Sequence, residues 1–132
     1  MCVANAARSQ MAEALARALL PAQVRVASAG SVPGPCVHPL AVQVMAELAI
    51  DMSGQFPKAI RDVALDEFEV VAALCAEEQC PVLPTQLRRL DWSLPDPAQG
   101  ADPDAQLQAF RSARDAIRAR VVALQSHLLG SA

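Results

Sequence analysis

A cysteine and an arginine near the start of the chain have the spacing of a loop that binds an oxyanion. Cys2 and Arg8 enclose five residues in the segment CVANAARS, and Ser9 follows Arg8 directly. A loop of this length that runs into a helix can turn successive backbone N–H groups inward and so form a cradle for an anion. The helix dipole and the nearby guanidinium favour the thiolate of Cys2. The guanidinium can also hold two oxygens of an anion at once, which a lysine does less well.

Two further residues fit such a loop. Asn5 tolerates the left-handed backbone conformation that a tight loop requires, and Ser9 can donate a hydrogen bond to the thiolate. With four cysteines in the chain, the same spacing arises by chance in roughly one such chain in three. The position of the motif at the start of a helix therefore carries most of the signal.

A second pair of cysteines, Cys75 and Cys80, lies in the segment LCAEEQCPVLP, directly after an apolar run. Acidic neighbours and Pro81 indicate a surface loop. In a regular helix the two Cα atoms lie too far apart for a disulfide, so a bridge requires a looped or unwound segment. A metal site is the alternative, but these cysteines and two histidines, His38 and His127, are a poor set of ligands. We therefore predict no metal.

Asp96 is the third candidate, because it lies on a loop between two prolines in the segment WSLPDPAQG. A carboxyl group fixed in this way can protonate a leaving group held in the anion cradle. Pro-Asp-Pro is also ordinary turn chemistry, and the segment by itself favours a turn.

The remaining cysteine and the two histidines are assigned structural roles. Cys36 has no obvious partner among the turn residues around it, and we expect it to have a packing role. His38 precedes a proline at the start of a helix, a position that favours a structural role over catalysis. His127 lies near the end of the last helix, where a positive charge is mildly favourable.

The rest of the chain alternates between helical and β patterns. Apolar residues three and four apart predict helices over residues 11–19, 40–48 and 103–128. The faces expected to be buried are Met11, Leu15, Ala18 and Leu19 in the first helix, Leu40, Val44 and Leu48 in the second, and Leu107, Phe110, Ile117, Val121, Leu124 and Leu128 in the third. The third helix has the clearest start, with Asp102 as N-cap, Pro103 at the first position and Asp104 in the first turn.

Three apolar runs predict β-strands between these helices. They are VRVAS at residues 24–28, EVVAAL within residues 66–74, and RRLDW at residues 88–92. Strands separated by helices predict an α/β domain with a small parallel sheet flanked by helices.

Length and composition indicate one domain and exclude several classes of partner. The 132 residues fit a single domain over residues 1–132, and 53% hydrophobic residues suffice for a core. A net charge of -3 and 3% aromatic residues argue against nucleic acid as a partner. The apolar runs are too short to span a membrane, and polar residues interrupt the first twenty positions, unlike a secretory signal. Four cysteines fit a reducing compartment, so we expect a cytoplasmic protein.

Six blocks of the sequence together resemble arsenate reductases of the low-molecular-weight protein tyrosine phosphatase family. In chain order they are CVANAARSQMAEALAR, SAG, HPLAVQVMAELAIDMSGQ, LCAEEQCPVLP, LDWSLPDPA and FRSARDAIRARV. They stand in the order that the family has and cover nearly the whole chain. The resemblance implies a small parallel sheet flanked by helices, with the Cys-x5-Arg-Ser loop binding the oxyanion.

The resemblance also implies a role for each candidate residue. Cys2 is the nucleophile that attacks arsenate, and Asp96 protonates the leaving oxygen. The residues of the oxyanion loop are Asn5, Ala6, Ala7, Arg8 and Ser9. Cys75 then attacks the sulfur of Cys2 and expels arsenite, and Cys80 attacks Cys75. An external thiol reductant, such as thioredoxin, a glutaredoxin or a low-molecular-weight thiol, reduces the resulting Cys75–Cys80 disulfide, and no metal or flavin is implied.

The sequence departs from the family at two places. The family has a central strand that ends at the nucleophile, and no such strand precedes Cys2. We expect the true start to lie upstream of Met1, because a loop at a frayed terminus cannot hold an oxyanion firmly. Ala49 stands where the family usually has glycine at the end of a helix, so we expect a positive φ and modest local strain there.

Two alternative functions stay open. A phosphatase acting on tyrosine phosphate tends to carry an aromatic residue beside the catalytic Asp-Pro, where this chain has Ala98, and has no use for the Cys75–Cys80 pair. A non-catalytic oxyanion-binding module would result if the missing strand made the domain inert.

Overall fold

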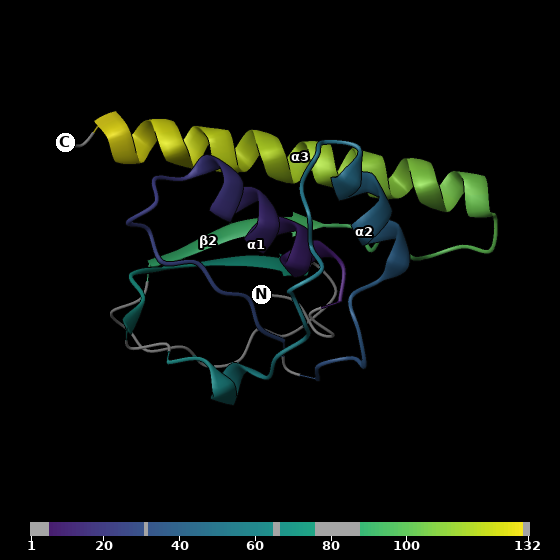
Figure 1. Cartoon of the computed structure of the whole chain (residues 1–132), viewed down its shortest axis with the longest axis horizontal. Coiled ribbons are helices and arrows are strands. Elements are labelled where there is room, and N and C mark those ends of the chain that lie inside the picture. Colours follow the sequence, from purple (N-terminus) through teal and green to yellow (C-terminus); the bar gives the residue numbers. More distant parts are fainter. Residues whose placement is uncertain (1–5, 31, 65–66, 76–87, 131–132) are drawn as a thin grey trace.

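The computed structural model describes residues 6–30, 32–64, 67–75 and 88–130 of the chain. The elements in chain order are α1 (Arg8–Leu19), α2 (Pro39–Ala46), the 3-10 helix η1 (Ile60–Asp62), β1 (Val70–Cys75), β2 (Arg88–Leu94) and α3 (Pro103–Gly130). Figure 1 shows α3 along the whole length of one side, with α1 and α2 against it and η1 at the opposite side.

The sheet of the described part consists of β1 and β2, which run parallel. Val70 pairs with Arg88 at the start, and Cys75 pairs with Leu94 at the end, after an irregularity between Ala73 and Cys75. Both α1 and α3 contact the sheet. The predicted class, an α/β domain with a small parallel sheet flanked by helices, is confirmed.

The helix α1 begins directly after the loop that carries the first motif. Its buried face includes Met11 and Leu15, which belong to the main core. The backbone becomes extended at Leu20, one residue before Pro21, because a proline disfavours helical geometry in the residue before it. The loop residues Ala6 and Ala7 are thereby attached to an element that the core holds in place.

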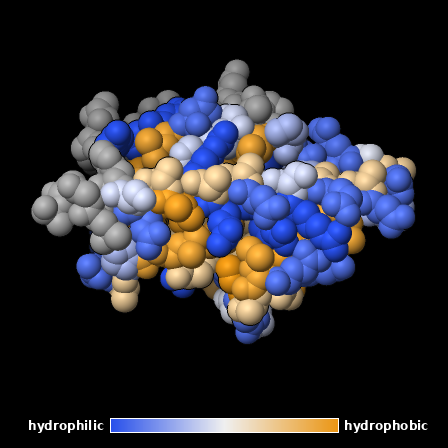
Figure 2. Space-filling view, turned by 90° about the horizontal axis from the view of Figure 1, so that it is seen from above, coloured by the Kyte–Doolittle hydropathy of each residue, from blue (hydrophilic) through white to orange (hydrophobic). Residues whose placement is uncertain are grey.

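The long helix α3 closes the core over α1 and α2. Asp102 Oδ1 accepts a hydrogen bond from the Asp104 backbone N–H at 3.2 Å, so the expected N-cap is present. Phe110, Ile117 and Val121 of the expected stripe are buried. Seen from the α3 side, the molecule shows hydrophilic residues over much of its surface, interrupted by hydrophobic patches (Figure 2).

Arg114 interrupts the apolar stripe of α3 and is nevertheless buried. Its Nη1 donates to the carbonyl oxygen of Val44 at 2.9 Å and to Glu47 Oε1 at 2.7 Å. The bond to Val44 satisfies one of the last carbonyl groups of α2, which lack partners within the helix. The polar position in the stripe thus joins α2 to α3.

The predicted strand at residues 24–28 is wrong. This segment forms no strand, and a cavity of about 460 Å³ lies between it and β1. A strand requires a neighbour at about 4.8 Å to supply its ladder of hydrogen bonds, and among the described residues the sheet contains only β1 and β2. In the described part of the chain, an isolated parallel bridge pairs Gly30 with Ala59 and so joins the end of this region to the residue before η1.

Two residues expected in the core are exposed, and one expected strain is present. Ala18 is exposed on α1, and Leu48 is 36% exposed because α2 ends at Ala46, before the third position of its apolar row. Ala49 has a φ of 61°, as expected from its place after a helix. Within the described ranges, no helix is long and apolar enough to cross a membrane.

Candidate active site

Arg8, the first residue of α1, lies where the carboxyl ends of the two strands meet. Its side chain is buried, and Nη1 donates to the carbonyl oxygen of Leu74 at 3.4 Å and to that of Leu94 at 2.7 Å. In Figure 1 both arrowheads end beside the start of α1. One guanidinium therefore ties the start of α1 to both strand ends, the edge at which open α/β sheets bind their ligands.

Two backbone hydrogen bonds fix the loop immediately before Arg8. The carbonyl oxygen of Ala6 accepts from the His38 N–H at 2.8 Å, and that of Ala7 accepts from the Met11 N–H at 2.9 Å. In a trans peptide the N–H points opposite to the preceding C=O. The N–H groups of Ala7 and Arg8 therefore point away from these partners, at the N-terminal end of α1, where helices bind anions.

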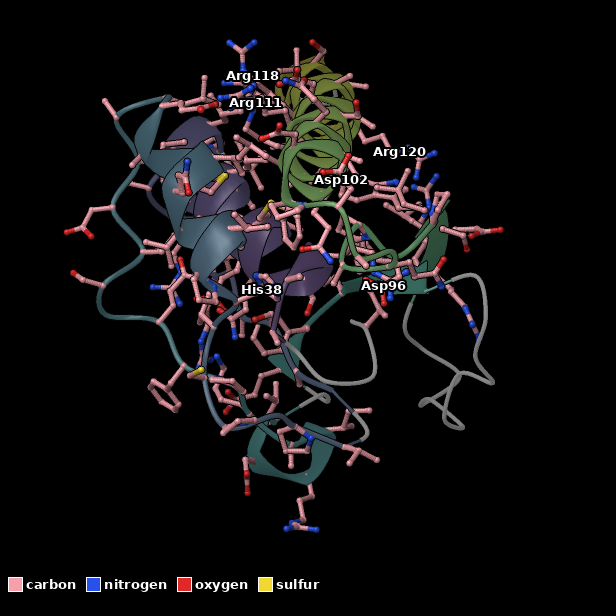
Figure 3. The ribbon with its side chains drawn as sticks, turned by 90° about the vertical axis from the view of Figure 1, so that its right-hand side faces the viewer. His38, Asp96, Asp102, Arg111, Arg118 and Arg120 are labelled. Carbon is pink, nitrogen blue, oxygen red and sulfur yellow. The ribbon has the colours of Figure 1, made fainter. Side chains whose placement is uncertain are left out.

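Asp96 lies two residues after the end of β2 and is partly exposed. Its Oδ1 accepts a hydrogen bond from the Ala98 N–H at 2.9 Å, which is the side-chain-to-backbone bond of an Asx turn. The turn expected from the two prolines is present, and it fixes the carboxyl group just beyond Leu94, to which Arg8 is bonded. Figure 3 shows Asp96 and His38 on either side of the first turns of α1.

Cys75 is the last residue of β1, and its backbone pairs with Leu94 of β2. This register brings the end of β1 to the same edge as Arg8 and Asp96. The remaining predicted site residues, Cys2, Asn5 and Cys80, lie outside the described residues. Ser9 is buried in the first turn of α1.

His38 has the structural role expected for it. Its Nδ1 accepts a hydrogen bond from the Leu40 N–H at 3.1 Å and so caps α2, and its ring centroid lies 4.7 Å from that of Phe110. The packing role expected for Cys36 is wrong, since this residue is exposed and its thiol is free. It lies in a segment with two prolines that loops over the surface, where few apolar partners are available.

A network of polar residues behind the loop was missed from the sequence. Gln10 is fully buried and bonds to Gln55, and the carboxylate of Glu13 is buried among the side chains of Ser28 and Lys58. These partners lie 15 to 45 residues away along the chain. The one sequence signal was Gln55, which stands inside the resembling block that ends in DMSGQ.

The described residues include no group of three side chains of His, Cys, Asp or Glu placed to hold a metal ion. The polar groups gathered at the strand ends are instead a buried guanidinium, backbone N–H groups at a helix start and a carboxyl group. Together these can bind a tetrahedral oxyanion and exchange a proton with it.

Sequence comparison assigns the chain to one family. Residues 1–130 match the sequence model of the low molecular weight phosphotyrosine protein phosphatases. The chain belongs to this family.

Within the family, the chain is similar to several proteins named arsenate reductase. It is 37% identical over 123 residues to the arsenate reductase of Brevibacillus brevis, a match that covers 92% of this chain and 87% of the relative. It is 39% identical over 127 residues to the glutaredoxin arsenate reductase of a Synechocystis species, covering 92% and 89% of the two chains. The resemblance stated from the sequence motifs is confirmed.

Solved structures agree with this assignment. The chain superposes on an arsenate reductase in the phosphate binding state with a TM-score of 0.77 at 36% identity, covering 96% of this chain and 93% of the other. It also superposes on the thioredoxin-dependent arsenate reductase of Corynebacterium glutamicum with a TM-score of 0.78 at 30% identity, covering 99% of this chain and 60% of the other.

Proposed function

We propose that this protein is an enzyme that reduces arsenate to arsenite, acting as a single domain over residues 1–132. The observation that carries the proposal is the position of Arg8, whose buried guanidinium joins the start of α1 to the ends of both strands. It stands beside the turn of Asp96 and the end of the strand that carries Cys75. The curated relatives named arsenate reductase support the same reaction.

In the first step, Arg8 and the backbone N–H groups of the loop bind the oxyanion. The residues of the loop are Asn5, Ala6, Ala7, Arg8 and Ser9. The thiolate of Cys2 attacks arsenic, an As–O bond breaks, and Asp96 gives its proton to the departing oxygen, which leaves as water. Arsenic stays in its +5 state and is now bound to the sulfur of Cys2.

The redox step follows by thiol exchange. The thiolate of Cys75 attacks the sulfur of Cys2, the electron pair of the S–As bond stays on arsenic, and arsenite leaves. Two thiols are thereby oxidised to the Cys2–Cys75 disulfide, and arsenic gains two electrons. Cys80 then attacks Cys75, which releases the thiolate of Cys2 and leaves the Cys75–Cys80 disulfide.

An external thiol returns the enzyme to its reduced form. We propose a thioredoxin-type protein as this reductant, because a protein dithiol supplies both electrons in one exchange. A glutaredoxin or a low-molecular-weight thiol is the alternative. The proteins similar to this chain include both a thioredoxin-dependent arsenate reductase and a glutaredoxin arsenate reductase. Such a cycle requires a reducing compartment, the cytoplasm.

The proposal is tested by arsenite formation with a thioredoxin system, comparing the wild-type protein with Cys2→Ser. We expect the variant to lose the activity, since a hydroxyl is a far weaker nucleophile than a thiolate at neutral pH. The matched control is Cys36→Ser, which removes an exposed thiol that has no part in the relay and leaves arsenite formation intact. Arsenite formation that survives Cys2→Ser would remove this residue from the mechanism.

The order of the relay is tested by Cys80→Ser. We expect one turnover, after which the protein stalls with a Cys2–Cys75 bridge that peptide mass mapping detects. Normal cycling of Cys80→Ser with thioredoxin would contradict the three-thiol relay. Hydrolysis of an aryl phosphate without loss of thiols would assign the chain to the phosphatases.

A further inference from the structure

A buried carboxylate lies behind the oxyanion loop, and two cations contact it. The side chain of Glu13 on α1 is 3% exposed. Its Oε1 accepts a hydrogen bond from Ser28 Oγ at 2.6 Å and lies 3.4 Å from Lys58 Nζ, while its Oε2 lies 3.2 Å from Arg17 Nη2. A buried carboxylate without a compensating charge is strongly destabilising, so one of these cations must stabilise it.

Of the two cations, Lys58 is the better shielded from solvent. Its side chain is 19% exposed, whereas that of Arg17 is 58% exposed. Water and salt screen an exposed charge far more than a buried one, so the attraction between Lys58 and Glu13 is the stronger. Lys58 is also the only lysine of the sequence.

Lys58 also lies in the segment of residues 55–58, which forms hydrogen bonds to Gln10 in the first turn of α1. Its Nζ donates to the carbonyl oxygen of Phe56 at 3.0 Å, and Gln10 Nε2 donates to the same oxygen at 3.0 Å. Gln55 Nε2 in turn donates to the carbonyl oxygen of Gln10 at 3.0 Å and to Gln10 Oε1 at 2.7 Å. Gln10 is fully buried, two residues after Arg8.

The partners of Glu13 come from two segments that the Gly30–Ala59 bridge joins to each other. Ser28, which bonds to Glu13, lies two residues before Gly30 on one side of the bridge. Lys58, which also contacts Glu13, directly precedes Ala59 on the other side. Glu13 therefore connects α1 to both segments of the bridge, through Ser28 to the segment that ends at Gly30 and through Lys58 to the segment that contains Ala59. Glu13 lies on the same helix as Arg8, the first residue of α1, so this contact helps to set the position of Arg8.

We propose that Lys58 is a positioning residue for the oxyanion site. Its ammonium is the internal counter-ion of Glu13, and it sets the position of the first turns of α1, from which Arg8 and the loop N–H groups face the anion. The inference rests on the proposed function, because it assigns the anion to the mouth of that loop. Geometry of this kind affects anion affinity beyond any effect on stability, since small displacements of a binding group are costly.

The first test compares binding of inorganic phosphate to the wild-type protein, Lys58→Met and Lys58→Arg by titration calorimetry. We expect Lys58→Met to bind phosphate about tenfold more weakly and Lys58→Arg, which keeps the charge, to recover most of that loss. The matched control is Arg17→Met, which removes the exposed cation from the same carboxylate and should change the affinity by less than about twofold. Equal affinity of Lys58→Met and the wild-type protein would overturn the proposal.

The second test uses the folded native protein and needs no activity. Because the chain has a single lysine, labelling with ¹⁵N-lysine gives one Nζ resonance. We expect this ammonium to exchange slowly with water, to shift when inorganic phosphate is added, and to lose its protection in Glu13→Gln. Glu67→Gln is the control, because Glu67 pairs with Arg25 in an exposed ion pair and should leave the resonance unchanged.

The outcomes separate this inference from the function on which it rests. A resonance that exchanges as fast as a free amine, or that ignores both Glu13→Gln and phosphate, overturns the role of Lys58 while leaving the proposed reductase intact. Failure of the wild-type protein to bind phosphate at all overturns the oxyanion site, and the positioning role with it.

Discussion

Arg8 Nη1 donates a 2.7 Å hydrogen bond to the carbonyl oxygen of Leu94, 86 residues further along the chain. The bond joins the start of α1 to the end of β2, two residues before Asp96. A second bond, to Leu74 at 3.4 Å, adds the end of β1. The residue assigned to anion binding is thus also the one that holds three elements in register at the site.

Replacing Arg8 by lysine tests this double role. An ammonium has no planar fork, and it cannot bond the two carbonyl groups and hold a tetrahedral anion in the same geometry. We expect Arg8→Lys to raise the phosphate dissociation constant at least about tenfold and to lower the melting temperature. Calorimetric titration and circular dichroism melts measure the two effects. Unchanged phosphate affinity in a folded variant would show that Arg8 only joins the three elements.

Asp96→Asn separates the proton donor from the turn. The amide oxygen of asparagine can still accept the hydrogen bond from the Ala98 N–H that aspartate makes at 2.9 Å, so the turn and the melting temperature should be preserved. Asparagine has no acidic proton, and we expect kcat for arsenate to fall about 100-fold. Steady-state kinetics measure this loss. Asp96→Ala, which removes the turn as well, is the comparison, and a kcat of Asp96→Asn near that of the wild-type protein would exclude Asp96 as the acid.

Ala49→Gly should stabilise the protein. Ala49 has a φ of 61°, a conformation that costs a residue with a Cβ roughly 1–2 kcal/mol. Glycine avoids this cost but adds freedom to the unfolded chain, which offsets about 0.4–1 kcal/mol. We therefore expect a net gain of about 0.5–1 kcal/mol in the free energy of unfolding, measured by urea denaturation. The control is Ala46→Gly, at the last helical position of α2, which should lower the free energy of unfolding. An equal decrease for Ala49→Gly would show that the backbone of Ala49 is not strained.

The ion pairs of Glu47 with Arg111 and Arg114 should make the protein less stable in acid. Hydrogen bonds from Arg111 and then Arg114 lower the pKa of the Glu47 carboxyl below its usual 4.5. A carboxyl whose pKa is lower in the folded state binds protons more readily when unfolded, so its stabilisation is fully present above about pH 4.5 and is lost as the pH falls through the folded pKa. We expect melting temperatures between pH 7 and pH 3 to fall less steeply for Glu47→Gln. If the melting temperature falls equally steeply with pH in the wild-type protein and in Glu47→Gln, the ion pairs of Glu47 with α3 do not contribute to stability.

The sequence motifs predicted the helices, two strands and the candidate site residues because these depend on local patterns. Asp102, Pro103 and Asp104 mark the start of α3 through contacts within four residues of one another. Arg8 and Asp96 could be chosen as candidates because their residue types and their neighbours in the sequence suit anion binding and proton transfer. That their elements meet at one edge follows from parallel strands, whose carboxyl ends lie on the same side.

The errors concern features that depend on distant partners. Residues 24–28 have the pattern of a strand, but a strand forms only beside a neighbour, and a cavity separates this segment from β1. The contact between Glu13 and Lys58 crosses 45 residues, and no spacing rule connects them. Cys36 was expected to have a packing role because free cysteines are often buried, but it lies exposed in a loop that contains two prolines.

The central claim is that arsenate draws its two electrons from the protein's own cysteines. The direct measurement is a thiol count on reduced, desalted protein before and after arsenate is added, with no other reductant and with disulfides located by mass spectrometry. The account predicts the loss of two thiols, dependent on arsenate and located at Cys75 and Cys80. An unchanged thiol count in folded protein that binds phosphate would contradict it.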